Sequence, residues 1–61
     1  MYVVRFVRKD RKPNEDYFYN KVEDALAHAQ LFENDDSGLY KHIYVLHHYH
    51  ENRWHILCRI L

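Results

Sequence analysis

Cysteine, glycine and proline are scarce in this sequence of 61 residues, which contains one of each. A single cysteine, Cys58, excludes a disulfide within the chain. With no secretory leader at the start, it predicts a reducing, cytoplasmic setting. Disorder is not expected either, because nearly half of the residues are apolar and the helix- and strand-breaking residues are rare.

Net charge and long apolar runs are also lacking. The formal net charge is +0 at pH 7, so the chain as a whole has no electrostatic attraction for nucleic acid or for an anionic membrane. No stretch approaches the ~18 apolar residues that a membrane-spanning helix requires. A chain this short buries only about 60% of the surface that it exposes when unfolded. We therefore expect a single small domain over residues 1–61 with a modest core.

The first segment is typical of a β-strand. Residues 2–8 (YVVRFVR) are rich in β-branched and aromatic side chains. Tyr2, Val4 and Phe6 alternate on one face, and we expect that face in the core because the other would bury Arg5. A charged loop with the only proline follows. The aromatic residues 17–19 are compatible with a short second strand.

A single amphipathic helix is predicted from about Lys21 to Glu33. Apolar residues recur there at intervals of three and four, which places them along one stripe. Asn20 with Glu23 three residues later has the spacing of a capping box, and Gly38 is a natural left-handed stop after the last turn.

The end of the chain predicts a β-hairpin with Glu51 and Asn52 at its tip. Residues 40–49 and 54–61 are the two strand-like runs, and opposed residues then have numbers that add up to 103. The apolar face consists of the pairs Tyr49–Trp54, His47–Ile56, Val45–Cys58 and Ile43–Ile60. Because opposed residues share a face of the sheet, we expect this set to face the helix.

These elements predict an α+β fold in the order β(β)αββ. It is a three- to four-stranded, mostly antiparallel sheet with one helix packed on one face. The expected core comprises Val4, Phe6, Val22, Ala25, Leu26, Ala29, Phe32, Ile43, Val45, Trp54, Ile56, Cys58 and Ile60.

The other face of the sheet is the main candidate for function, because one helix can cover only one face. Its expected contact residues are Tyr44, Leu46, His48, His55, Leu57 and Arg59. Apolar side chains gathered on an uncovered face more often mark a protein contact than plain surface. We therefore expect a non-enzymatic interaction module. It would form a homodimer, or bind another protein partner, through this face or through an unprotected edge strand.

Two alternatives come from the imidazoles and aromatic rings of the same hairpin. His48, His50 and His55 would lie together if His48 opposes His55, and three imidazoles can hold Zn²⁺ or Ni²⁺. A single-stranded nucleic acid could instead stack on Tyr40, Tyr44, His48 and Arg59, with the basic segment 8–12 along the phosphates. The zero net charge and the leucines on that face oppose the second alternative.

No catalytic residue is predicted. Cys58 is expected on the core face, where a thiol is inert, and the only glycine excludes a glycine-rich phosphate loop. No motif identifies a family. The order of strand, helix and hairpin after a charged first loop is similar to that of short bacterial and mobile-element reading frames.

Overall fold

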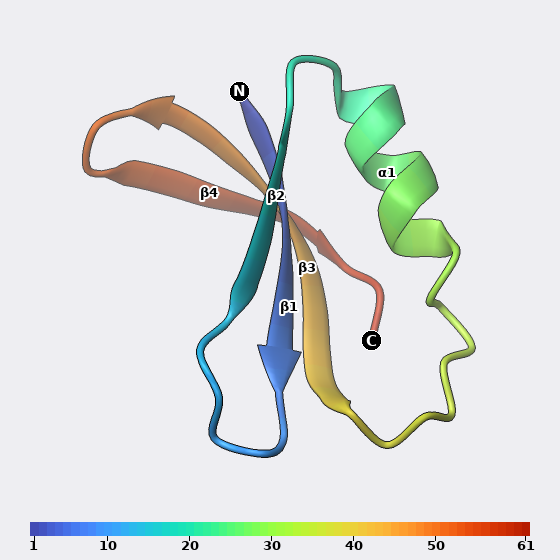
Figure 1. Ribbon diagram of the computed structural model, residues 1–61. Helices are drawn as coiled ribbons and strands as arrows, with labels where there is room; N and C mark the ends of the chain where they lie inside the picture. Colours follow the sequence, from blue (N-terminus) through green and yellow to red (C-terminus); the bar gives the residue numbers. More distant parts are fainter.

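The computed structural model describes residues 1–61 and shows a four-stranded antiparallel sheet with one helix beside it (Figure 1). The elements are β1 (Tyr2–Arg8), β2 (Glu15–Tyr19), α1 (Val22–Gln30), β3 (Tyr40–His50) and β4 (Arg53–Arg59). The strand order β2-β1-β3-β4 places the first strand in the centre of the sheet. The α+β prediction is confirmed, and the second strand is real and longer than residues 17–19. The only helix is too short and too polar to cross a lipid bilayer.

The core lies between the helix and the two central strands. Val4 and Phe6 of β1 are buried beside Ile43 and Val45 of β3, as the alternation of β1 predicted. The helix adds Ala25 and Ala29, both fully buried, and these small side chains allow it to approach the sheet closely. Partly buried residues complete this core: Tyr2, Tyr19, Leu26, Phe32, Tyr40, Cys58, Ile60 and Leu61.

The ends of the helix differ from the prediction. Lys21 is the residue that caps the N-terminus, and no side chain makes a capping hydrogen bond, so the predicted capping box of Asn20 and Glu23 is wrong. The regular helix ends at Gln30 and continues as short turns through residue 34. Gly38 does have a left-handed φ of 77°, but it shapes the later loop rather than the helix end.

A charged cluster fixes the loop between β1 and β2. Arg8 donates from Nε and Nη2 to the Asp10 carboxylate and from Nη1 to Glu15 Oε2 at 2.7 Å. The hydrogen bonds from Arg8 are the main cause that holds the pKa of Asp10 well below its ordinary value. The reciprocal bonds, first to Asp10 and then to Glu15, raise the pKa of Arg8.

Replacing Phe6 with alanine should remove a large part of the free energy of unfolding. The Phe6 ring makes edge contacts with Phe32 and Tyr17, with ring centroids 5.0 and 5.6 Å apart. Removing a buried phenylalanine costs about 3–5 kcal/mol. A domain of this size has a total stability of roughly 3–9 kcal/mol. Urea unfolding followed by circular dichroism tests this. Leu31→Ala, at an 80% exposed position, should change little. Equal losses in both variants would contradict the described core.

The Arg8–Asp10 pair should make stability sensitive to acid. Because the folded pKa of Asp10 lies below its ordinary 3.8, the pair stabilises the fold above that pH. Its contribution is lost as the pH falls below 3.8. We therefore expect Asp10→Asn to be less stable than the parent at pH 6 and the difference to shrink towards pH 2. Urea unfolding at several pH values measures this. Glu33→Gln, which removes a carboxylate without an ion pair, should show no such convergence.

Candidate functional site

The β3–β4 hairpin contains two register shifts that the sequence did not reveal. Its tip at Glu51–Asn52 and the pair Val45–Cys58 are as predicted, with His50 opposite Arg53 at the tip. Between the shifts the pairing is displaced by one residue, and the pairs are Leu46–Ile56, His47–His55 and His48–Trp54. The predicted pairs His47–Ile56 and Tyr49–Trp54 are therefore wrong. Leu57 in β4 and Tyr49 in β3 are the extra, bulged residues.

The displacement moves Trp54 and Ile56 to the face opposite the helix. A slip of one residue turns a side chain to the other side of a sheet. Trp54 is 41% and Ile56 54% exposed, so neither belongs to the core as predicted. His55 instead lies on the helix side of the sheet, where it opposes His47.

The surface opposite the helix, here called the open face, contains four of the six predicted contact residues. Tyr44, Leu46, His48 and Arg59 lie there, whereas His55 lies on the other side and Leu57 is a bulge residue. The open face also contains residues from the remaining strands and the displaced part of β4. These are Val3, Arg5, Asp16, Phe18, Trp54 and Ile56.

The predicted metal site loses its geometry. His48 opposes Trp54, His55 opposes His47, and His50 opposes Arg53 beyond a bulge, so the assumed His48–His55 pair is wrong. No three side chains of His, Cys, Asp or Glu come together in a group that could hold a metal ion.

The predicted nucleic-acid platform loses one of its four stacking residues. A register shift next to Arg8 turns Tyr40 to the helix side, where its ring lies 5.0 Å from that of Phe6.

A chain of polar and aromatic contacts crosses the open face, and we call it the strap: His48, Trp54, Arg5 and Asp16. The His48 ring is stacked on the Trp54 ring, with centroids 4.0 Å apart and planes 7° apart. The Arg5 guanidinium lies 5.2 Å from the Trp54 ring centroid and donates two hydrogen bonds to the Asp16 carboxylate, at 2.9 and 3.0 Å. The bond to Asp16 is the largest cause that raises the pKa of Arg5. The strap therefore connects all four strands.

The strap explains two buried residues on a face that no helix covers. Val3 is 0% and Leu46 4% exposed, and they lie opposite each other on β1 and β3. Since β3 separates β1 from β4, a Trp54 ring close to Arg5 must extend over β3. The strap is thus a partial cover over these two aliphatic side chains.

One apolar row runs across the sheet from edge to edge. Phe18 opposes Val3, Val3 opposes Leu46, and Leu46 opposes Ile56. The two middle residues are buried, while Phe18 and Ile56 at the ends are each 54% exposed. Adjacent strands are about 4.8 Å apart, so the row is roughly 14 Å long. Its ends present apolar surface to the surroundings.

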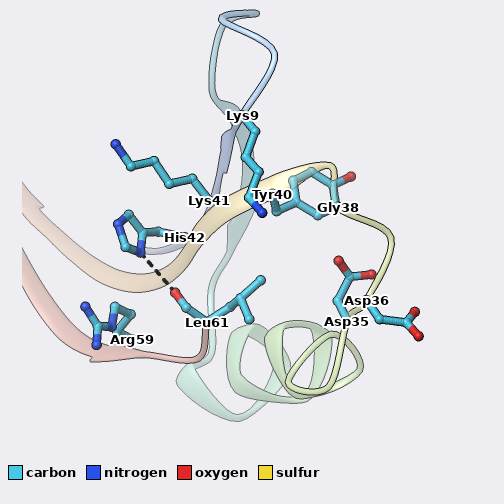
Figure 2. A pocket seen from close by; sticks show the side chains of 9 residues that line it. All are labelled: Lys9, Asp35, Asp36, Gly38, Tyr40, Lys41, His42, Arg59 and Leu61. Carbon is cyan, nitrogen blue, oxygen red and sulfur yellow. Dashed lines mark hydrogen bonds between the residues drawn. The ribbon is translucent and has the colours of Figure 1, made fainter.

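A separate pocket of about 380 Å³ lies at the end of the sheet where β1 and β4 finish and β3 begins (Figure 2). Its charged or ionisable lining residues are Lys9, Asp35, Asp36, Lys41, His42 and Arg59. Gly38, Tyr40 and Leu61 complete the lining. His42 Nδ1 and the carbonyl oxygen of Leu61 lie 3.3 Å apart, which connects the start of β3 with the end of the chain.

Sequence reasoning missed the strap and the pocket for different reasons. The opposition of Arg5 and Asp16 could have been found, because an antiparallel second strand that starts before residue 17 puts these charges together. No sequence signal marked the bulges that bring Trp54 over β3. The pocket unites loop and strand residues that are distant in the sequence.

Comparison with known proteins finds no relative. No protein-family model, no curated protein and no solved structure matches this chain. The geometry of its own surfaces is therefore the basis for a function.

Replacing Asp16 with asparagine should loosen the strap without unfolding the protein. Arg5 would lose a paired charge, an interaction worth about 0.2–1 kcal/mol at a partly exposed site. Trp54 is the only tryptophan, so its fluorescence reports the change directly. We expect red-shifted emission and stronger quenching by iodide in Asp16→Asn but not in Asp24→Asn, on the helix. Identical quenching in all three proteins would show that Asp16 does not hold the strap.

Proposed function

We propose that this protein is a non-enzymatic interaction module that forms a homodimer through its open face. The apolar row carries the proposal. Phe18 and Ile56 are exposed large apolar side chains at the two ends of the row, whose central residues are buried. Trp54 adds a third apolar surface beside them. Several exposed large apolar side chains on one face of a small protein support a binding role.

The composition of the open face fits a protein interface. Tryptophan, tyrosine and arginine are the residues that most often dominate binding energy, and the face contains Trp54, Tyr44 and two arginines. Arg5 is already paired with Asp16, so burying this part of the face would not strand an isolated charge.

The size of the face is sufficient for a protein partner such as a second copy of the chain. The Cα positions extend over 32 × 23 × 14 Å, so the two longer dimensions bound an area on the order of 700 Å² for the whole chain, helix and loops included. A specific interface buries about 800 Å² on each partner. Most of the open face would therefore be covered in a dimer that packs sheet against sheet.

Charge also favours self-association. The chain carries equal numbers of acidic and basic residues, so two copies approach each other without net repulsion. A two-fold axis would place the apolar row of one copy against the same surface of the other, as in most homodimers.

The open face is a better candidate than the β4 edge. If two β4 strands paired in antiparallel fashion around Ile56, Arg53 of one copy would oppose Arg59 of the other. Directly opposed like charges destabilise a strand pair. The bulge at Leu57 also interrupts the ladder that such an edge would offer.

Lysine at either end of the apolar row should separate the dimer. Phe18→Lys and Ile56→Lys each place a charge in the proposed interface while changing positions that are half exposed in one copy. Loss of a buried large apolar group is worth about 1.5–3 kcal/mol, so dimer affinity should fall at least roughly tenfold. Light scattering after size-exclusion chromatography over a range of concentrations measures this. Leu46→Lys is unsuitable because Leu46 is buried and its loss would unfold the protein.

The matched control is Leu31→Lys, which adds the same charge at an 80% exposed apolar residue after the helix. It should dimerise like the parent. A parent protein that stays monomeric at every concentration would refute the proposal. Equal dissociation in all three lysine variants would show that charge, and not the open face, controls association.

A further inference from the structure

The pocket at the end of the sheet is lined by residues of opposite charge that form no ion pairs with one another. Lys9, Lys41 and Arg59 make no ion pair, and neither do Asp35 and Asp36. Of the other three arginines on the sheet, Arg5 and Arg8 are paired with carboxylates, and Arg53 at the hairpin tip is not. Unpaired charges thus gather around one space that could hold a ligand.

Most residues of the two signs lie on different sides of that space. Figure 2 shows Lys41, His42 and Arg59 on one side and Asp35 with Asp36 on the other, with Lys9 between them beside Tyr40 and with the Lys41 side chain pointing away from the aspartates. The hydroxyl of Ser37 donates to Asp35 Oδ2 at 2.7 Å, which orients that carboxylate. A ligand seated between the two sides would meet cations at one end and carboxylates at the other.

The backbone around the pocket is held in place without a ligand. The Lys9 amide donates to the Leu39 carbonyl at 2.9 Å, and the Ile43 amide donates to the Leu61 carbonyl at 3.2 Å. The Leu39 amide donates to the Ser37 hydroxyl, and the left-handed φ of Gly38 turns the loop between them. Pockets that are largely formed in advance are typical of small-molecule sites.

We infer that this pocket binds a small zwitterion, whose anionic group contacts Lys41, His42 and Arg59 and whose amine contacts Asp35 and Asp36. A volume of about 380 Å³ accommodates a small molecule of this kind. A long polyanion does not fit the charge pattern, because its next phosphates would approach the two aspartates. The inference does not rest on the homodimer: Lys9, Lys41 and the 35–38 loop lie outside the open face, and Arg59 is shared by the open face and the pocket.

Titration with three defined probes tests the inference: O-phosphoethanolamine, inorganic phosphate and ethanolamine. Binding is followed through the backbone amide signals of residues 35–42 and 59–61 in nuclear magnetic resonance spectra. We expect O-phosphoethanolamine to shift these signals and to bind at least tenfold more tightly than either half of it alone. Absence of binding at millimolar concentrations, or equal affinity for inorganic phosphate, would overturn the zwitterion site.

Two variants identify the sides of the pocket. Lys41→Glu should weaken O-phosphoethanolamine binding at least tenfold, because it reverses the charge on the basic side. Asp36→Asn should weaken O-phosphoethanolamine binding but leave inorganic phosphate binding unchanged or stronger. Both residues are exposed, so the fold should survive, which circular dichroism verifies.

The matched control is Lys21→Glu, which makes the same charge change on the surface before the helix. It should bind O-phosphoethanolamine like the parent. An equal loss of affinity in Lys21→Glu and Lys41→Glu would show that net charge, and not the pocket, controls binding. Ile56→Lys should also bind O-phosphoethanolamine normally whether or not it dimerises, so the two proposals can fail separately.

Discussion

A sheet of four strands has two faces, and this chain has one helix with which to cover them. The helix side is closed in the ordinary way, with alanines allowing α1 to lie close to the central strands. The open face has to be protected by its own side chains. Arg5 and Asp16 hold the outer end of the strap, and the Trp54 ring reaches across β3 to shield two aliphatic residues. That cover stops short of the sheet edges, and the ends of the apolar row remain exposed.

The two bulges in the hairpin decide what the open face contains. Without them, Trp54 and Ile56 would face the helix, and His55 would take their side of the strand. Bulges also increase the local twist of a strand pair. In Figure 1 the tip of the hairpin accordingly lies away from α1, so the helix does not cover the tip. The same register shift places His55 on the other face from His48. The shift that brings Trp54 to the open face therefore also separates the predicted metal ligands.

The two proposed sites would bind through different interactions, apolar contact at the open face and charge pairing in the pocket. The open face offers apolar surface, and the charge of Arg5 at its centre is paired with Asp16. Removing apolar surface from water by contact with another apolar surface is favourable. The pocket offers the opposite, a set of charges that the fold leaves without partners. Arg59 belongs to both regions, at the border between the sheet face and the pocket. The two proposed binding surfaces therefore adjoin at Arg59 on one sheet.

The sequence by itself determined the order of the elements, the inward face of β1, the helix stripe and the position of the hairpin tip. Each of these follows from local periodicity or turn chemistry, which neighbouring residues express on their own. Only the tertiary structure decided the faces of Trp54, Ile56 and His55, because a bulge changes the register without changing the hydrophobic pattern. It also decided the true start of the helix, where Lys21 replaced the expected Asn20 cap. The strap and the pocket depend on contacts between segments far apart in the chain. Such contacts arise from packing and have no signature in any single stretch of sequence.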